Sequence, residues 1–514
     1  MKRKTLHSSS LVFLGRSTLL NFLFALEAGI ALVLDLVIAA VLGFSTTSDL
    51  LYAAWMLPQM IGRGIFQSLT AALMGLFLHQ KNKMTAYNHA ITVIAAAGIL
   101  TAALFSLTSG LWLPISVPGI AGDIGSEAVP LAGIFSLMIA FLAIAETLRA
   151  VFYRENKKWW PTLSRFIAGL TTVSFVLFAG YKQNLALVAI AITAGTALEA
   201  AMDLAGFRWL LGFKIKLLWP NKDLRKEMRS VIGAPLLGSS VRVVAGTVER
   251  ALASLLLPGS VVAVTYANRI INALDRLVFR GFVITTVQMH EGKKKLDLRA
   301  NIRLVVIVAL PITLIFAVLL QPLITVLFAR GRFTSADVQT LTLVLQLYTP
   351  AILGIALTRI PFGLAYAQKH TKAILGFFVL SSITLILSEA LFILAGLELY
   401  SFGLGYTLSI WVAYIWLYRL ILKPRQTRLM NWIEIAQFVL IALIALAGTY
   451  WVTSLVRQRI FDSQQADWLI LAFGIAGCAC ALVVAAVALR LEEARFIIRR
   501  ALKSMGKGGR GTKT

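Results

Sequence analysis

The charged side chains inside long apolar stretches are the residues of this sequence that could do chemistry. Eleven arginines and no lysine lie within such stretches, together with several aspartates and glutamates. A charge in hydrocarbon is costly, so it usually faces a cavity or an oppositely charged partner. The planar guanidinium keeps its charge in a medium of low dielectric constant and binds phosphate through two parallel hydrogen bonds. A cavity lined by arginine would therefore suit an anionic ligand such as a diphosphate.

Some of these acidic and basic residues are candidates for binding such a ligand. Arg269 and Arg359 have no obvious partner on their own helix, so we expect them to face a cavity. Asp35 has no adjacent basic residue, and we expect the same of it. Scattered acidic partners would keep a cationic cavity tolerable while it is empty. The full set of predicted substrate-binding residues is Arg269, Arg359, Arg63, Asp35, Asp49, Glu27 and Arg250.

Other embedded charges have a simpler explanation. Glu146 and Arg149 stand three residues apart, which is the spacing of a structural ion pair on a helix. Several arginines lie near the predicted inner ends of their helices, where a long side chain reaches the lipid headgroups. These are Arg16, Arg149, Arg276, Arg280 and Arg419.

The sequence indicates no enzyme, no cofactor and no resident metal. No phosphate-binding loop of the Walker type is present. The two cysteines, Cys478 and Cys480, point to different faces of a helix, and we expect two small buried apolar residues rather than a disulfide. The five histidines show no metal-ligand spacing, and we expect them in solvated loops; they are His7, His79, His89, His290 and His370.

The elements that must position these charges are transmembrane helices. The chain is 59% hydrophobic and 14% charged, which is too little charge to cover a soluble domain of this size. Its apolar runs are continuous and long enough to cross about 30 Å of hydrocarbon as helices. The sequence therefore predicts an all-α polytopic membrane protein with about fourteen crossings. The predicted spans are 11–42, 50–78, 90–113, 129–153, 160–180, 185–207, 230–256, 261–289, 304–328, 338–367, 373–394, 402–422, 432–455 and 468–489.

The net charge of +26 reflects orientation in a membrane rather than binding to nucleic acid. With the N-terminus placed inside, 33 of the 49 Lys and Arg fall in inside segments, 5 in outside segments and 11 within the spans. This is the positive-inside pattern, and it predicts that both termini are cytoplasmic. No cleavage site follows the N-terminal apolar stretch, so we expect that stretch to be retained. Basic segments beside the membrane also attract anionic lipid.

An internal repeat divides the chain. Tyr52 and Tyr266 each stand before an alanine, 214 residues apart, and Tyr153 and Tyr366 each end a span, 213 residues apart. Because six helices separate the copies, the repeat is parallel, about an axis normal to the membrane. The predicted organisation is an N-lobe of six helices (1–207), a basic cytoplasmic linker (208–229), a C-lobe of six helices (230–422), two further helices (423–489) and a basic cytoplasmic tail (490–514).

Several motifs resemble those of the MurJ/MviN family. The stretch LFARGRFTSAD at 327–337 is similar to the outer-loop motif of that family, and LQLYTP at 345–350 follows it, with Arg359 beyond. Ser254 with PGS at 258–260, YANRI at 266–270, Ser48-Asp49 with LPQ at 57–59, and Phe152-Tyr153 before a basic loop are similar too. The resemblance covers nearly the whole chain, and fourteen helices is the count of the family.

The resemblance implies a flippase for lipid II, the undecaprenyl-diphosphate-linked peptidoglycan precursor, in the bacterial cytoplasmic membrane. It implies two six-helix lobes around a cationic cavity, a lipid-tail groove on the last two helices, and alternating access linked to a cation or to the membrane potential. Asp35, Asp49, Arg269 and Arg359 match family positions. The chain departs from the family at Leu34, Gly62, Gln67 and Asn268, where an arginine, an arginine, an acid and an aspartate are expected, and Arg63 stands beside Gly62.

Two other functions remain open at this point. A related flippase could carry another lipid-linked oligosaccharide, such as an exopolysaccharide or cell-wall polymer unit. A non-transporting scaffold of a cell-wall complex would use the embedded charges only to pair with one another. A drug exporter of the same superfamily would have twelve helices, which the two extra helices here disfavour. We expect a monomer whose partners are the lipid-linked sugar diphosphate, membrane lipids and a coupling cation.

Overall fold

The computed structural model describes residues 26–488 with short gaps. Arg16, Arg280, His7, His290 and both terminal basic segments therefore lie outside the described residues, and so do the positions of the two termini. The gaps are at 28, 80–81, 121–126, 182–183, 221, 280–281, 284–285, 287–297, 369, 424–431 and 460–463.

The described residues form helices and no strand, which confirms the predicted all-α class. In the N-lobe the helices are Gly29–Leu42, α2 (Thr46–Gln59), η1 (Met60–Ile65), α3 (Phe66–His79), α4 (Lys83–Leu107), α5 (Ser109–Ser116), η2 (Pro118–Ile120), α6 (Ala128–Ser136), α7 (Met138–Arg154), α8 (Trp159–Tyr181) and α9 (Leu185–Trp209). In the C-lobe they are α10 (Lys222–Ser254), α11 (Ser260–Leu274), η3 (Asp275–Phe279), α13 (Leu298–Phe328), α14 (Ser335–Ala367), α15 (Thr371–Leu394), α16 (Tyr400–Leu417) and η4 (Tyr418–Leu422). Two more, α17 (Trp432–Arg459) and α18 (Gln464–Ala488), follow.

Each predicted span contains at least one of these helices. Within the described residues, nine helices are long and apolar enough to cross a membrane, and two shorter apolar helices accompany them. The second predicted span is divided into α2, η1 and α3, and α10 carries many charges, so neither is among the nine. The exact number of fourteen crossings stays a prediction.

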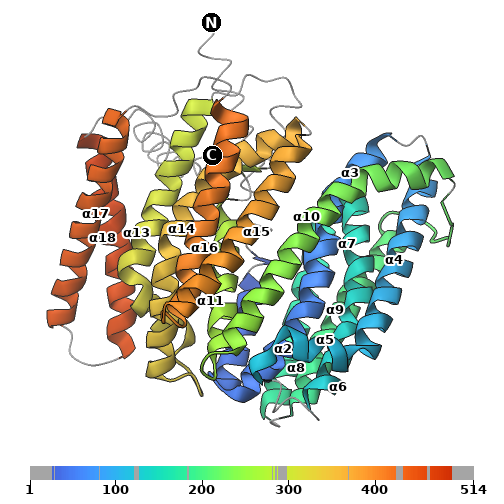
Figure 1. Cartoon of the computed structure of the whole chain (residues 1–514), viewed down its shortest axis with the longest axis horizontal. Coiled ribbons are helices and arrows are strands. Elements are labelled where there is room, and N and C mark those ends of the chain that lie inside the picture. Colours follow the sequence, from blue (N-terminus) through green and yellow to red (C-terminus); the bar gives the residue numbers. More distant parts are fainter. Residues whose placement is uncertain are drawn as a thin grey trace, which may run out of the picture.

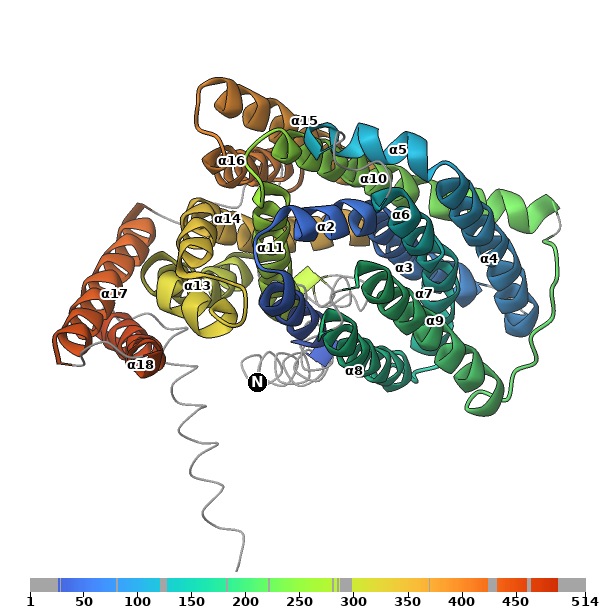
Figure 2. The same cartoon turned by 90° about the horizontal axis from the view of Figure 1, so that it is seen from below.

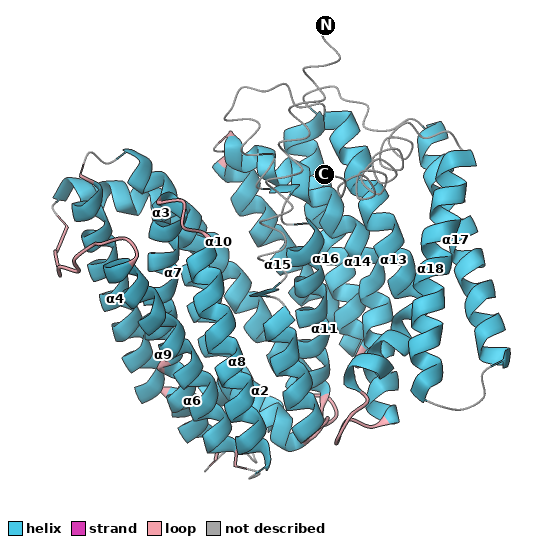
Figure 3. Ribbon diagram, turned by 180° about the vertical axis from the view of Figure 1, so that it is seen from behind, coloured by secondary structure: helices cyan, strands magenta, loops and turns pink. Residues whose placement is uncertain are grey.

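The helices form two groups that meet at one end. In Figure 1 they converge near α2 and α11 and diverge toward the opposite end, and Figure 3 shows the same arrangement from behind. The helix α10 links the two groups, because it packs against α15 on one side and against α3 and η1 on the other. The last two helices lie at the edge, where α18 and α17 pack against α13 (Figure 2).

Short π-helical segments interrupt matching helices of the two lobes. The segment η1 (Met60–Ile65) follows α2, and η3 (Asp275–Phe279) follows α11. The two segments lie about one repeat length apart in the chain, close to the 214 residues that separate Tyr52 from Tyr266. A π-helical turn inserts an extra residue and is frequent at functional sites. The repeat is therefore visible in local backbone geometry as well as in sequence.

The linker between the lobes is partly ordered against α4. The helix α10 begins at Lys222, eight residues before its predicted start, so the end of the predicted linker 208–229 is helical. The extended part bonds along α4: the amide of Lys216 donates to Asn88 Oδ1 (3.1 Å), and His89 Nδ1 lies 2.8 Å from the carbonyl oxygen of Leu218. The expectation of a solvated loop was therefore wrong for His89.

Candidate functional site

Arg269 of α11 meets Asp35 of the first helix at the junction of the lobes. Its Nη1 forms an ion pair with Asp35 Oδ1, and its Nη2 donates to Gln59 Oε1 at 3.0 Å. The guanidinium carbon lies 4.4 Å from the ring centroid of Trp55 and 5.1 Å from that of Tyr52. The Arg269 side chain is still 19% exposed. An arginine held by a carboxylate, an amide and two rings, and yet partly open, can exchange one of these partners for an anionic ligand.

Asp49 joins the lobes at the end where they converge. Its two carboxylate oxygens accept hydrogen bonds from the backbone amides of Gly259 (2.6 Å) and Val262 (3.0 Å) at the start of α11. The first amides of a helix have no partner within the helix, and the helix dipole favours a negative charge there. Asp49 is 3% exposed, so the structure places this predicted binding residue in a helix cap rather than on an open surface.

Further contacts seal the same end of the molecule, which we call the closed end. The amide of Arg332 donates to the carbonyl oxygen of Ala40 (2.9 Å), and the amide of Gly119 donates to Ser254 Oγ (3.0 Å). Gly119 has no space for a side chain, since a Cβ atom there would lie 1.8 Å from the carbonyl oxygen of Ser254. These contacts, with the Asp49 cap, join N-lobe and C-lobe elements, so the structure represents a state that is closed at this end.

A buried network of three arginines and three glutamates lies inside the N-lobe. Arg165 of α8 is its centre: Nε donates to Glu199 (2.8 Å), Nη1 to Glu27 (2.9 Å) and Nη2 to Glu146 (2.6 Å). Arg149 Nη1 lies 3.4 Å from Glu27, and its Nε lies 3.8 Å from Glu146. The equal number of opposite charges and the many hydrogen bonds make their burial tolerable.

Arg149 is part of this network and does not reach the headgroups. Its side chain is 3% exposed, so the snorkelling interpretation was wrong for this residue. The structural pair of Glu146 with Arg149 is confirmed at 3.8 Å. Sequence reasoning missed the further partner Glu27, which comes from the start of the chain and lies buried between α7 and α8.

Arg63 is the most exposed member of the network. Its Nη2 donates to Glu199 Oε2 at 2.9 Å, while its side chain is 28% exposed. The neighbouring Gly62 faces the other way, since a Cβ atom there would lie 2.5 Å from Leu142 Cδ1. An arginine at position 62 would therefore clash with α7. Of positions 62 and 63, only 63 can place an arginine side chain in contact with Glu199 and Glu146 of the N-lobe network.

Arg359 of α14 has its partner on a neighbouring helix of the C-lobe. Its Nη2 lies 2.8 Å from Oδ1 of Asp275 in η3, and the two side chains are 18% and 19% exposed. The corresponding N-lobe contact joins Arg63 of η1 to Glu146 of α7 at 3.9 Å. Because Glu146 and Arg359 are 213 residues apart, the two lobes carry matching ion pairs in which the acid and the base have exchanged places.

Two buried acids of the C-lobe form no salt bridge within the part of the chain that the structure describes. Glu389 of α15 is fully buried, and neither carboxylate oxygen has a hydrogen-bond partner among the described residues. Glu249 of α10 is 4% exposed and accepts a hydrogen bond from Asn268 Nδ2 at 2.9 Å. An ionised carboxylate without a partner is very costly in such a place. Glu389 therefore carries a proton or needs a bound cation. The sequence shows it as an acid embedded in an apolar run, but Glu389 was not among the predicted binding residues.

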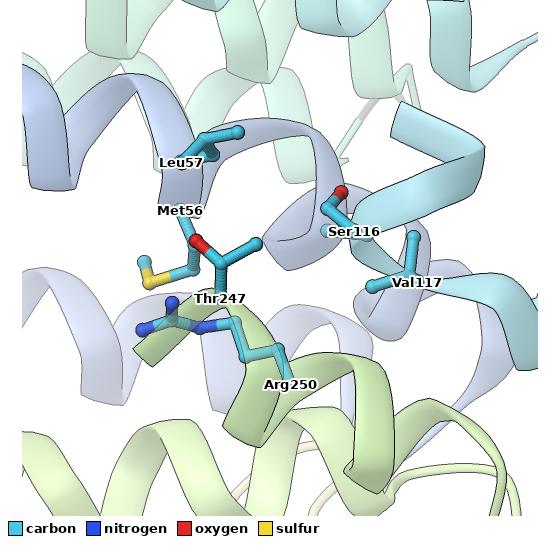
Figure 4. A pocket seen from close by; sticks show the side chains of 7 residues that line it. Met56, Leu57, Ser116, Val117, Thr247 and Arg250 are labelled. Carbon is cyan, nitrogen blue, oxygen red and sulfur yellow. The ribbon is translucent and has the colours of Figure 1, made fainter. Parts of the chain in front are cut away.

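Arg250 of α10 lies in a small cavity between the lobes. Its Nη1 donates to the carbonyl oxygen of Gly246 (2.9 Å) and contacts Met60 Sδ (2.7 Å). The cavity has a volume of about 10 Å³, enough for one water molecule. Figure 4 shows its walls: Met56 and Leu57 of α2, Ser116 and Val117 at the end of α5, and Thr247 and Arg250 of α10.

Neither a metal cluster nor a disulfide is found in the part of the chain that the structure describes. No group of three or more His, Cys, Asp or Glu side chains is placed to hold a metal. Cys478 is buried, as expected, but Cys480 is exposed, so the expectation of two buried cysteines was half wrong. His370 accepts a hydrogen bond from the amide of Ala373 and thus caps α15.

Comparison with known proteins identifies the family. The family profile described as "Lipid II flippase MurJ" matches residues 38–469, which is most of the chain. The chain belongs to this MurJ family. A protein of Treponema pallidum named "Probable lipid II flippase MurJ" is 23% identical over 501 residues, covering 90% of this chain and 92% of its own length. A protein of the same name from Buchnera aphidicola subsp. Schizaphis graminum is 23% identical over 438 residues, covering 80% and 82%.

Solved structures show the same fold. A structure entitled "Lipid II flippase MurJ, inward closed conformation" superimposes with a TM-score of 0.77 at 17% identity, over 92% of this chain and 100% of that one. An inward-facing multidrug-resistance transporter of the MATE family superimposes with a TM-score of 0.61 at 13% identity, over 81% and 99%. At these identities the likeness concerns the fold alone. It confirms the predicted transporter fold of the MurJ family.

Proposed function

We propose that this protein flips lipid II from the inner to the outer leaflet of the bacterial cytoplasmic membrane by alternating access. The match of residues 38–469 to the MurJ family supports the substrate, and the lobes joined at one end support the mechanism. The reaction is transport, so no bond of the substrate is made or broken. The observation that carries the proposal is Arg269, an embedded and partly exposed cation held at the lobe junction by groups that a diphosphate can replace.

The binding surface is formed by Arg269 and Arg359 of the C-lobe and Arg63 of the N-lobe. Each is between 18% and 28% exposed and each is anchored by a carboxylate. Guanidinium groups from both lobes would hold the diphosphate, while Asp35 competes with it for Arg269. Asp49 and Glu27 do not contact the ligand in this proposal but hold the helices that carry the surface. Asp49 caps α11, and Glu27 binds Arg149 and Arg165 in the N-lobe network. The prenyl tail would remain in lipid beside α17 and α18.

The two buried acids of the C-lobe, Glu249 and Glu389, support coupling of transport to a cation. We propose that this cation is the proton. Movement of α10, which contacts both lobes, would change the surroundings of Glu249. Glu389→Gln keeps the shape of the buried acid but binds no proton. In vesicles with an imposed pH gradient, we expect this variant to flip at a rate that no longer responds to the gradient, with Glu398→Gln as an exposed control. An unchanged response would exclude Glu389 as the coupling group.

The orientation with both termini in the cytoplasm is part of the proposal. It places the open end of the molecule, next to the basic segment at 154–158, on the cytoplasmic side. Reporter fusions after Gly259 should then be read outside and fusions after Lys294 inside. The reversed pair of readings would overturn both the orientation and the inward-facing interpretation.

Complementation is the decisive experiment. A bacterial host depleted of its own lipid II flippase should regain growth when this gene is expressed, and vesicles with the purified protein should accelerate lipid II flipping. The alternative of another lipid-linked oligosaccharide predicts membrane expression without rescue, and flipping of that other substrate. A scaffold predicts no flipping of either. The expected monomer is tested separately, by the mass of the detergent-solubilised protein.

A further inference from the structure

The segment that connects the two lobes lies along the outer side of α4. Gly212, with a φ of 68° in the left-handed region, turns the chain back after the end of α9. The ring of Phe213 then packs on those of Phe207 and Tyr87, with centroids 5.4 and 5.8 Å away. Figure 2 shows the connection from α9 to α10 at the outer edge of the N-lobe, beside α4. We call its residues 214–219 the strap.

The backbone of every second residue of the strap is bonded to α4. The side chain of Asn88 accepts a hydrogen bond from the amide of Lys216 (3.1 Å) and donates one to the carbonyl oxygen of Lys214 (3.3 Å). The hydroxyl of Thr92 accepts a hydrogen bond from the amide of Leu218 (3.0 Å). This spacing of two is that of an extended chain, in which successive side chains point to opposite sides.

The strap is amphipathic because of this alternation. Its odd-numbered residues are Ile215, Leu217 and Trp219, and they are 43%, 80% and 65% exposed. Lys214 and Lys216 stand between them in the chain and are exposed as well. A contiguous apolar surface that the protein leaves uncovered marks an interaction site. The covering partner must therefore offer an apolar phase with negative charge beside it.

The strap lies at the depth where hydrocarbon gives way to lipid headgroups. It is bonded to positions 88 and 92 of α4, and the apolar stretch predicted to cross the membrane begins at residue 90. Exposed tryptophan side chains are typical of this depth. Trp209, the last residue of α9, is 81% exposed, and Trp219 is exposed at the end of the strap. The apolar phase beside the strap is therefore the bilayer.

The charge of this connection selects the kind of lipid. Residues 207–222 contain four basic residues and no acidic residue. The basic residues are Arg208, Lys214, Lys216 and Lys222, and all four side chains are exposed. Basic side chains at a membrane surface attract anionic headgroups, and their long apolar stems can lie along the acyl chains.

We propose that the strap is a binding surface for anionic phospholipid. Ile215, Leu217 and Trp219 enter the boundary between acyl chains and headgroups, and Lys214 and Lys216 bind the headgroup phosphates. In the proposed orientation this is the cytoplasmic leaflet. The surface is separate from the arginines between the lobes and does not depend on which molecule the protein transports. Because the strap is part of the only covalent link between the lobes, bound lipid fixes this link at the membrane surface beside α4.

Quenching of a fluorescent label by lipid tests the surface. In the full-length protein with Cys478→Ser and Cys480→Ser, the substitutions Ile215→Cys, Lys216→Cys and Leu217→Cys are made one at a time and labelled with bimane. The phosphatidylcholine vesicles contain a small fraction of either phosphatidylglycerol or phosphatidylcholine that carries a nitroxide on its acyl chain close to the headgroup. We expect stronger quenching at 215 and 217 than at 216, because the sides alternate. At 217 the phosphatidylglycerol should quench more than the phosphatidylcholine, by about two-fold or more.

The control variants separate charge from structure. Lys214→Gln combined with Lys216→Gln should bring the ratio of quenching by the two lipids at 217 close to one, whereas replacement of both lysines by Arg should keep it. Lys372→Gln removes an exposed lysine of α15 and should not change the ratio. Equal quenching by the two lipids with both lysines present would overturn the proposal. So would a label at 217 that neither lipid quenches, because the apolar side would then face water and be open to a protein partner instead.

Discussion

The hydroxyl groups of Tyr52 and Tyr266 lie 3.4 Å apart, although 214 residues separate them in the chain. These two tyrosines occupy equivalent positions of the internal repeat, on α2 and α11. Both are almost completely buried, and their rings meet at an angle of 88°. The contact between equivalent residues places them beside the axis that relates the two lobes. The Tyr52 hydroxyl also donates to Asp35 Oδ1 at 3.3 Å, so the axis passes close to the Asp35–Arg269 ion pair.

Arg269 should be required for transport with limited effect on folding. Replacement by Ala removes a charge-assisted contact to the diphosphate worth about 1.5–3 kcal/mol, so binding should weaken about ten- to hundred-fold. Arg269→Lys should restore only part of it, because a point charge lacks the two-pronged geometry. Yield and flipping per molecule are measured in the same membranes. Normal flipping by the alanine variants of both Arg269 and Arg359 would exclude the hypothesis that these arginines bind the diphosphate in a cavity.

Asp35→Asn should act differently from these arginine variants. The amide no longer competes with an anionic ligand for Arg269, so substrate affinity should stay equal or increase. The ion pair that holds the first helix to α11 is lost, and we therefore expect slower turnover. Binding of lipid II and flipping rate are compared in one preparation. A variant with weaker binding and unchanged turnover would contradict this role.

The N-lobe network should matter for stability rather than for affinity. Arg165→Met removes the cation that binds three buried glutamates, and breaking a buried pair in this way costs about 3–5 kcal/mol. The fraction of protein that stays monodisperse in detergent after heating should fall strongly. Arg419→Met removes an exposed arginine and is the matched control. If both variants lose the same small fraction, the network contributes little to the stability of the lobe.

Asp49 should stabilise the closed end through the α11 cap. Asp49→Ala leaves the amides of Gly259 and Val262 without acceptors, and the loss of such a cap costs about 0.5–2 kcal/mol. The closed end should then open more often. Ser116→Cys, in a protein whose two cysteines are replaced (Cys478→Ser and Cys480→Ser), reports this opening through its reaction rate with a neutral thiol reagent. An unchanged rate would show that the cap does not hold the lobes together.

Much of the fold follows from the sequence, because its causes are local. Apolar length predicts the helices, and the offset of Tyr52 and Tyr266 predicts the repeat. Pairings between distant helices are not visible in this way. Arg149 lies near a helix end, and this position alone predicts that its side chain reaches the lipid headgroups. In the structure its side chain instead contacts Glu27, which is 122 residues away in the chain and lies in the N-lobe. The Asp49 cap joins residues 210 apart, and the π-helical segments η1 and η3 leave no signal in composition.

The last two helices lie at one edge of the molecule, and their position suits a surface for lipid. The helices α17 and α18 pack on each other and touch the rest of the described chain chiefly through α13 (Figure 1). Apolar side chains on them remain exposed, among them Trp451 at 65% and Phe473 at 53%. Such exposure is expected for a surface that contacts a prenyl tail or bilayer lipid.

These two helices should therefore be needed for transport but not for folding of the lobes. Deletion of residues 430–514 should leave a protein that inserts in the membrane and keeps the Arg269 contacts. It should not flip lipid II, because the tail has lost its guiding surface. Insertion is checked by membrane fractionation, and flipping is measured per inserted molecule. Full activity of the truncated protein would exclude the groove, whereas loss of insertion would show that α13 needs α17 and α18 in order to fold.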